Sequence, residues 1–274
     1  MGFFTEIESL EQVPQFEVVK EPVFDRDRNS IPGAYSLQRT DTGCHLGMVG
    51  ESYRPIQMSE MVDIMSRASK KIGDIDHLGF TESKGGKKVV IQSKLPEPID
   101  VGGDKVEPYI YTVVDHSGMG SNKVIPSTIR IACDNAFHLI KSNTDNRAHH
   151  ASTFDDKVKA MIGSIIDSIE SAKGFKGIME KLKSIKFSKD QMIKLTQTLI
   201  PVEKEESTRR VNKRERLVEL FASGRGNQGK TRWDALNALT EYETHNGKQS
   251  AEKFIRNMTN NNLSRQGLKL LNAA

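Results

Sequence analysis

The feature that most constrains the fold is a change in hydrophobic periodicity near residue 150. Before it, strand-like runs such as 87–95, 108–114 and 123–133 alternate with turn residues. After it, apolar residues recur at the three- and four-residue spacing of one helix face over about 155–185. We therefore predict an α+β fold, with an antiparallel β-meander packed on a long helix and followed by a helical C-terminal part.

The first turn of this meander is predicted at Gly85 and Gly86. They join the strand-like runs 80–84 and 87–95. Two glycines between such runs favour a two-residue hairpin turn, because both turn positions need a positive φ. The same reading predicts a second hairpin over 34–49 and helices at about 59–70, 134–141, 189–200, 208–222, 232–245, 250–258 and 263–271.

A chain of 274 residues is long enough for one large domain or two of ordinary size. We expect three consecutive parts: a sheet-rich N-terminal domain at 1–150, long helices packing on the sheet at 151–202, and a helical region at 208–274. The charged run between the last two parts is the expected boundary.

Composition narrows the class of protein. The sequence has no run of 18 apolar residues, and its first residues do not resemble a secretory signal. Cys44 and Cys133 are too few for a disulfide framework, which favours a reducing compartment. We therefore expect a cytoplasmic protein with no membrane association.

The net charge of +4 conceals an uneven distribution. Residues 173–234 contain sixteen Lys and Arg against eight Asp and Glu, a net of +8, so the rest of the chain carries −4. A basic segment of this size indicates nucleic acid or another polyanion as a partner. Helix faces that are simply solvated are the alternative.

Several basic residues are candidates for binding phosphate groups. Lys84, Lys87 and Lys88 flank the predicted Gly-Gly turn, and the other candidates follow on later strands and the long helix: Lys123, Arg130, Arg147, Lys157, Lys159 and Lys173. Tyr109 and Tyr111 lie on a predicted strand and could stack on bases. Strand aromatics more commonly belong to the core, and lysines on a hairpin also protect a sheet edge.

The segment 224–231 matches the phosphate-binding pattern G-x-x-x-x-G-K-[ST]. In a nucleotide-binding protein this loop follows a buried strand, whereas the residues before Gly224 have helical spacing and many charges. Only 43 residues follow Thr231, with no apolar strand ending in Asp. We interpret the segment as a glycine C-cap, a loop and a helix start with Thr231 as N-cap, with a bound backbone phosphate left open.

Other chemistry has weaker support. Metal-ligand residue types occur at Cys44, His45, Cys133, His149 and His150, without a C-x-x-C or H-x-x-x-H pair. A nuclease site could be built from Arg147, His149 and His150 with Asp134 or Asp145, but no metal-binding spacing sets those carboxylates. We therefore expect no metal, no cofactor, no catalytic residue and no enzymatic activity.

Three segments resemble the phage/plasmid-like protein family, a domain of unknown function of phages, plasmids and prophages. They are residues 47–55, 130–135 together with 147–150, and 229–242. Members have a Gly-Thr-Trp-like entry to a helix in the third segment, without requiring the lysine. This chain departs at the start of the first segment and at Asp134, where a less acidic residue is usual. The resemblance implies phage or plasmid DNA metabolism.

The order of elements, a β-meander that leads into a long helix, also resembles in topology the ring-forming single-strand annealing proteins of the Red-beta, RecT and Erf group. Fold analogy by itself does not establish function. Our leading expectation is a homo-oligomeric protein of the bacterial host cytoplasm that binds single-stranded DNA and promotes its annealing. The alternative is a phage-encoded structural or regulatory protein–protein interaction module. A third hypothesis, an ATPase or nuclease, predicts hydrolysis that is lost on Lys230→Ala or His149→Ala.

Overall fold

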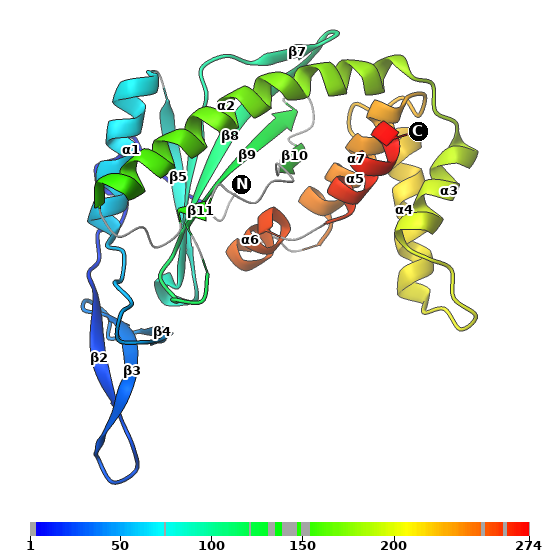
Figure 1. The fold of residues 1–274 in the computed structure, drawn as a ribbon. Coiled ribbons are helices and arrows are strands. Elements are labelled where there is room, and N and C mark those ends of the chain that lie inside the picture. Colours follow the sequence, from blue (N-terminus) through cyan, green and yellow to red (C-terminus); the bar gives the residue numbers. More distant parts are fainter. Residues whose placement is uncertain are drawn as a thin grey trace. The chain divides into compact units, whose positions relative to one another are not determined.

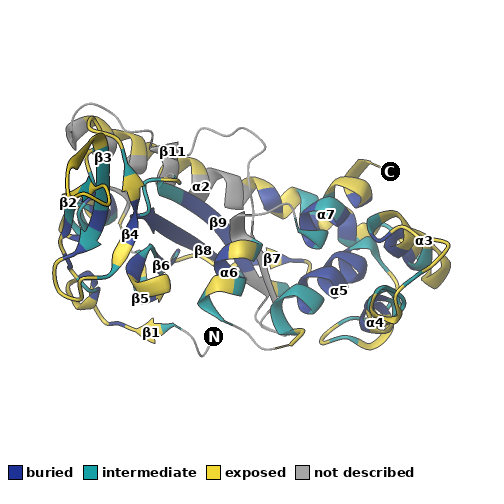
Figure 2. Cartoon of the chain, turned by 90° about the horizontal axis from the view of Figure 1, so that it is seen from below, coloured by how far each residue is buried: buried dark blue, intermediate teal, exposed yellow. Residues whose placement is uncertain are grey.

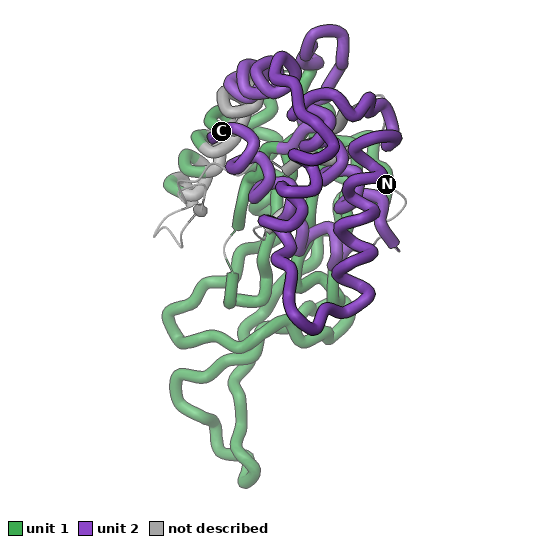
Figure 3. The backbone as a smooth tube through the Cα atoms, turned by 90° about the vertical axis from the view of Figure 1, so that its right-hand side faces the viewer, with its two compact units in different colours: residues 1–96, 109–126, 140–169 green, residues 97–108, 127–139, 170–274 purple. Residues whose placement is uncertain are grey.

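The computed structural model describes residues 4–73, 75–120, 122–130, 135–138, 147–148, 154–247, 250–259 and 262–273. It has the predicted α+β architecture, with antiparallel sheets and helices concentrated in the C-terminal part (Figure 1). The chain divides into two compact units (Figure 3). Unit 1 comprises 1–96, 109–126 and 140–169, and unit 2 comprises 97–108, 127–139 and 170–274. Neither unit is continuous in sequence.

The larger sheet has the order β1-β5-β6-β8-β9-β10, and β7 and β11 pair with β8 and β9. Strand pairs β1–β5, β5–β6, β6–β8, β7–β8, β9–β10 and β9–β11 are antiparallel. Its strands are β1 (Thr5–Glu6), β5 (Asp76–Ser83), β6 (Lys88–Lys94), β7 (Ile99–Val101), β8 (Asp104–Asp115), β9 (Asn122–Arg130), β10 (Asn135–His138) and β11 (Arg147–Ala148). The predicted meander of β5, β6, β8 and β9 is therefore confirmed.

A smaller sheet consists of β2 (Val18–Phe24), β3 (Ser30–Arg39) and β4 (His45–Val49), in that order and antiparallel. Strands β3 and β4 form the predicted second hairpin. The short 3₁₀ helix η1 (Leu10–Gln12) precedes this sheet.

The helices follow the predicted periodicity closely. They are α1 (Met58–Ile72), α2 (Phe154–Ser184), α3 (Lys189–Leu199), α4 (Thr208–Ser223), α5 (Arg232–His245), α6 (Ala251–Thr259) and α7 (Leu263–Ala273). Ser188 caps α3 as expected, since its side chain accepts a hydrogen bond from the Gln191 N–H. Helix α2 continues through Gly174 and Gly177, where we considered a break.

Two local predictions are wrong. Strand β10 lies in the region 134–141, where we predicted a short helix, because pairing with β9 overrides local propensity. The turn between β5 and β6 has four residues and not two, since Ser83 pairs directly with Lys88. It contains the 3₁₀ turn η2 (Lys84–Gly86), in which Gly85 and Gly86 do have positive φ angles of 68° and 94°.

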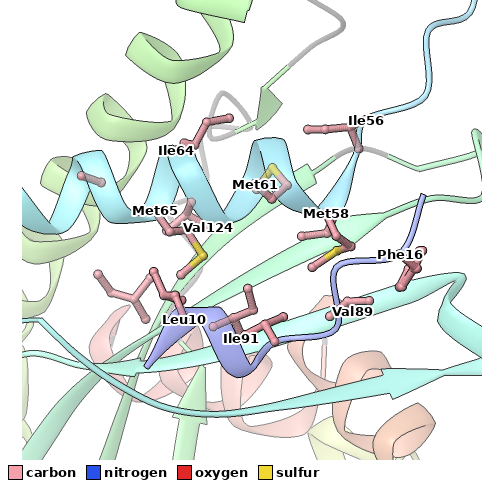
Figure 4. Packing of buried hydrophobic residues seen from close by; sticks show 14 of the residues in the cluster. Leu10, Phe16, Ile56, Met58, Met61, Ile64, Met65, Val89, Ile91 and Val124 are labelled. Atoms are coloured by element: carbon pink, nitrogen blue, oxygen red, sulfur yellow. The ribbon is translucent and has the colours of Figure 1, made fainter. Parts of the chain in front are cut away.

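Unit 1 has a core of its own (Figure 4). The apolar side of α1, built from Met58, Met61, Ile64 and Met65, packs against buried side chains of the sheet and the N-terminal segment such as Leu10, Phe16, Val89 and Ile91. Unbranched Met fills irregular gaps between a helix and a sheet well, which suits a helix with this composition.

Unit 2 has a second core. Its centre is α5, in which nine consecutive residues from Trp233 to Glu241 are buried. Helices α3, α4 and α7 contribute Met192, Leu217, Phe221 and Leu271 to the cluster around it. Phe175, Met179 and Leu182 of α2 pack there too, with Val101 and Val106 of β7 and β8. Within unit 2, the second half of the long helix therefore packs on sheet residues.

Candidate nucleic-acid interface

The loop 84–87 contacts Arg39 of the smaller sheet. The Arg39 Nη1 donates to the Gly85 carbonyl at 3.2 Å, and a β-carbon added at Gly86 would lie 2.6 Å from the same nitrogen. A side chain at Gly86 would therefore clash as well as strain the positive φ. Lys84 is exposed and Lys87 is half-buried. The sequence led us to expect a solvated lysine-rich tip, whereas the structure packs its backbone.

Arg39 itself was not a candidate, and it is the most heavily engaged cation of this region. Only 7% of the side chain is exposed. It forms two hydrogen bonds to the Asp41 carboxylate (2.9 and 2.7 Å) and one to Glu82 (3.0 Å), and lies 3.9 Å from the centre of the Phe16 ring. The hydrogen bonds to Asp41 raise the pKa of Arg39. Arg39 acts as a structural clamp, and no sequence pattern identified it.

Lys88 is partly neutralised within the fold. Its Nζ lies 3.3 Å from the Asp115 carboxylate, which is buried and directly opposite Lys88 in the β6–β8 pairing. Asp115 also accepts hydrogen bonds from the N–H and hydroxyl of Ser117, at 2.9 and 2.5 Å. With Arg39, Glu82 and Asp41 included, the loop region carries four positive and three negative groups. The net charge of these groups is therefore +1, which is smaller than the +3 of the three lysines alone.

The remaining candidates lie in different parts of the chain. Register pairs Arg147 of β11 with Lys123 of β9, where Lys123 is half-buried, and Lys159 of α2 is exposed. The backbones of Arg130, Lys157 and Lys173 lie on β9 and α2, but the side chains of these three and of Arg147 are outside the described residues. Arg130 and Lys173 belong to unit 2 and the other candidates to unit 1.

The expected base-stacking role of Tyr109 and Tyr111 is not supported by their positions. They are 8% and 0% exposed. Their rings stack on each other with centres 6.4 Å apart, and the Gln92 side chain donates to the Tyr111 hydroxyl at 3.2 Å. Because both rings are core residues of unit 1, we remove them from the candidate interface.

The basic segment of unit 2 keeps a positive surface. Ten of its Lys and Arg side chains between 174 and 234 are exposed, against six exposed Asp and Glu. The exposed basic residues are Lys176, Lys181, Lys186, Lys189, Lys194, Lys204, Arg209, Arg216, Arg225 and Lys230. The exposed surface of this segment therefore carries a net charge of about +4 at neutral pH, since Lys and Arg are protonated there.

Other basic residues of the segment serve the fold. Arg214 makes a bidentate ion pair with Glu206, and the Arg210 Nη1 lies 2.7 Å from Glu203. Lys183 donates to the carbonyls of Val101 (3.0 Å) and Gly102 (2.7 Å). The sequence alone could not separate these internal contacts from the exposed set.

The segment 224–231 is not a phosphate-binding loop in its structural context. Helix α4 precedes it and α5 follows. The Asp234 carboxylate accepts the N–H groups of Gln228 (3.3 Å), Lys230 (3.0 Å) and Thr231 (3.0 Å), while Glu241 accepts the Arg225 N–H at 2.9 Å. Both acids are buried. A carboxylate of the protein thus fills the position in which a P-loop would hold a phosphate.

Thr231 confirms the interpretation of this segment as a helix start. Its side chain accepts from the Asp234 N–H at 3.2 Å, and Asp234 accepts in return from the Thr231 N–H, which forms a capping box. Gly224, which we expected as the C-cap of the preceding helix, occupies that position. The Lys230 side chain is exposed beside this closed loop.

Residues with metal or acid–base potential are scattered. Among the described residues, no group of three or more His, Cys, Asp or Glu is placed to hold a metal ion. The His45 Nδ1 lies 2.9 Å from the Ser36 hydroxyl, and Cys44 is half-buried beside the loop at Gly85. Cys133, Asp134, Asp145, His149 and His150 lie outside the described residues.

Two further titratable residues were missed by sequence reasoning. His116 is 1% exposed, and burial lowers its pKa to about 4. Glu243 of α5 caps α7, because its carboxylate accepts the Leu263 N–H and the Ser264 hydroxyl, each at 2.6 Å. Burial raises the pKa of Glu243 against these hydrogen bonds. Neither residue stands in a sequence motif that predicts burial.

No described helix is long and apolar enough to cross a membrane. Comparison with curated proteins and with solved structures found no match. A family model does match residues 45–268, which is most of the chain and includes the three segments noted in the sequence. The chain therefore belongs to the family described as a domain of unknown function (DUF932).

Proposed function

We propose that this protein binds single-stranded DNA through electrostatic contacts and has no catalytic role. The observation that carries the proposal is the positive exposed surface between 174 and 234, with ten basic against six acidic side chains. Contacts between lysine or arginine and phosphate provide sequence-independent affinity, because bound counterions are released from the nucleic acid.

Unit 1 contributes a smaller set of candidate contacts. Lys84 and Lys159 are exposed, and Lys87 is half-buried. The loop that carries Lys84 and Lys87 is fixed by Arg39, so little loop entropy would be lost when these lysines meet a phosphate. Burial of Tyr109 and Tyr111 argues against base stacking there, which favours contacts to the backbone that leave base edges able to pair.

The setting of this activity is also part of the proposal. Resemblance to phage and plasmid proteins supports a role in the DNA metabolism of a phage or plasmid within the bacterial host cytoplasm. Annealing of complementary strands would follow if a homo-oligomer held many strands with their bases exposed, since linked sites bind multivalently.

The test is a fluorescence-anisotropy titration of the full chain with a labelled oligonucleotide over a series of salt concentrations. We expect the logarithm of the association constant to fall linearly with the logarithm of salt, by about 0.7 per phosphate contact on a single strand. No binding at low salt, or binding that does not change with salt, would contradict the proposal.

Charge variants locate the contacts. Lys186→Glu with Lys189→Glu should weaken binding and reduce the salt slope by about 1 to 2. Glu215→Lys, an exposed change of opposite sign on α4, should strengthen binding. In unit 1, Lys84→Glu is compared with Lys70→Glu, which makes the same charge change at an exposed side chain of α1. Equal affinities for these two variants would remove the 84–87 loop from the interface.

A protein–protein interaction module is the second candidate function. It is favoured by the local balance of only +1 around the 84–87 loop and by the ion pairs of Arg210 and Arg214 on α4. This candidate predicts no nucleic acid in the purified protein, measured as a protein-like absorbance ratio at 260 and 280 nm, and no anisotropy change.

A further inference from the structure

The hairpin of β2 and β3 continues beyond its supports as a projecting arm, which we define as residues 21–33. At its base, the Lys20 Nζ donates to the carbonyls of Gly50 (3.3 Å) and Tyr53 (3.2 Å). The Gln57 side chain pairs with both backbone groups of Val18, at 2.8 and 2.9 Å. Past these contacts residues 24–33 are all exposed (Figures 1 and 2). The base of the arm is therefore fixed and its outer half is open to contact.

The arm exposes large apolar side chains. Phe24 and Ile31 are 57% and 41% exposed, on the two strands next to the turn. A two-stranded hairpin without further packing is marginally stable in water. Burying the apolar side chains of such an arm against a second surface is favourable, by about 25 cal/mol per Å² of apolar area removed from water.

The turn at the end of the arm is not built for maximal stability. Asp25 closes it, since its carboxylate accepts the N–H groups of Asp27 (2.9 Å) and Asn29 (2.8 Å). Arg28 adopts a φ of 64°, a conformation for which glycine or asparagine is preferred. The turn would form more readily with either of these residues, so its geometry does not explain an arginine at this position.

The open edge of the arm is poorly suited to adding another strand. The Thr40 N–H donates to the Glu17 carbonyl, so Glu17 faces β3 while Val18 faces outward to Gln57. By the two-residue period of a strand, Pro22 shares the outward side of Val18 and lacks an N–H to donate. At this β2 edge, a partner would therefore be bound by side chains of the arm and not by an added strand.

We propose that the arm is a self-association element whose partner is the arm of a second copy of this chain. The four residues Asp25-Arg26-Asp27-Arg28 alternate in sign and are exposed. A two-fold axis reverses the residue order, so each acidic position of one copy faces a basic position of the other, as a self-complementary interface requires. Phe24 pairs with Ser30, so its side chain lies on the opposite face of the arm from Ile31. Phe24 of the two copies forms the apolar centre of the contact.

The arm lies outside residues 45–268, the part of the chain that matches the family model. Self-association through the arm would provide a contact for the homo-oligomer of the proposed function, and in that respect this inference rests on the proposed function. It needs no nucleic acid, however, so its test is separate from the binding experiment.

The experiment is sedimentation velocity on the full chain without nucleic acid, over a wide range of protein concentration. The native chain should associate reversibly, because a small contact of this kind gives a weak interface. Two variants should each raise the dissociation constant at least tenfold: Phe24→Ser, and Arg26→Glu with Arg28→Glu. The matched control, Lys70→Glu with Lys269→Glu, makes the same charge change at exposed residues outside the arm and outside the basic segment, and should associate like the native chain.

A mixing experiment tests the charge pattern directly. A chain with Arg26→Glu and Arg28→Glu and a chain with Asp27→Arg should each associate poorly alone and form a mixed dimer together. A native chain that stays monomeric at all concentrations would overturn the proposal, and so would arm variants that associate like the control. DNA binding by a monomeric native chain would overturn only this inference and leave the proposed DNA binding intact.

Discussion

At the residue scale, two buried polar side chains hold the backbone of two loops through hydrogen bonds. Asp234 collects three backbone N–H groups of the segment 228–231, and Arg39 collects two carboxylates, a carbonyl and an aromatic ring. Each is a charged group that is buried because all its partners are provided within the fold. Such residues resemble functional ones in sequence, since both kinds are polar and lie in loops.

Replacing Asp234 tests the structural interpretation of the P-loop-like segment. Asp234→Ala should lower the free energy of unfolding by about 2 to 4 kcal/mol, because several N–H groups would lose their acceptor in a buried loop. Lys230→Ala, at an exposed side chain, should change it by less than about 0.5 kcal/mol. Urea denaturation measures both values. Loss of ATP binding in the lysine variant without any stability change would support a P-loop instead.

His116 makes stability depend on pH. Its folded pKa is about 4 because of burial, with the Arg39 cation adding to the shift and the Ile56 backbone and the Asp115 carboxylate opposing it. In the unfolded chain it titrates near the ordinary value of 6.5. Between these values the unfolded state binds more protons, so stability falls as pH falls, by about 3 kcal/mol in total.

The measurement compares the native chain with His116→Phe, which keeps an aromatic ring against Phe16. The difference between their free energies of unfolding should shift in favour of the variant as pH decreases from 7 to 4. Carboxylates that titrate in this range affect both proteins alike and cancel in the difference. Parallel pH profiles would show that His116 is not buried as a neutral group.

At the scale of elements, residues with positive φ occur in the arm and in the 84–87 loop for two different reasons. In the loop, Gly86 is required because Arg39 occupies the space of a side chain. In the arm, Gly33 has a φ of 73° with open space around it, and Arg28 adopts φ 64° without being glycine. At these two positions of the arm, glycine is favoured by the backbone conformation and not by the packing of a neighbouring side chain.

Paired substitutions test this distinction. Arg28→Gly should stabilise the arm by about 0.5 to 1 kcal/mol, and Gly33→Ala should destabilise it by a similar amount, because only glycine adopts positive φ without steric cost. Hydrogen exchange of the Asp25 amide, which donates to the Asn29 carbonyl, reports the local opening of the arm. Equal exchange rates in both variants would contradict the assignment of strain to these positions.

At the scale of the whole molecule, the two compact units share several elements. Strands β8 and β9 and helix α2 each contribute residues to both units. The first core centres on α1 and the second on α5. The order of residues along the chain therefore does not coincide with the division into compact units.

The shared elements predict a single unfolding transition. Met61→Ala in the first core and Leu239→Ala in the second, both at side chains with 0% exposure, should each lower stability by about 2 to 5 kcal/mol. Because β8, β9 and α2 run through both units, each substitution should move the same calorimetric transition. Two transitions that respond separately to the two substitutions would contradict this expectation.

Much of the fold was predictable because it depends on local patterns. The apolar spacing of α2, the Ser188 and Thr231 caps, and the strands of the meander all follow from neighbouring residues. The region 134–141 was predicted wrongly, since its strand β10 depends on pairing with β9. Of the candidate site, the exposure of Lys84 followed from the sequence, whereas the sequence left open whether Tyr109 and Tyr111 stack on bases or belong to the core, where the structure places them.

The α+β class, the approximate bounds of the seven helices and the excess of positive charge in 173–234 were all readable from the order of residues, because periodicity, capping and charge are local properties. Which of the charges face solvent depends on the folded chain. Arg39 and Lys183 contact partners distant in sequence, and Arg214 pairs with Glu206, which precedes it by eight residues. Lys84, Lys186 and Lys230 remain at the surface. Burial and ion pairing arise from contacts across the folded chain, and those contacts leave no local signal in the order of residues.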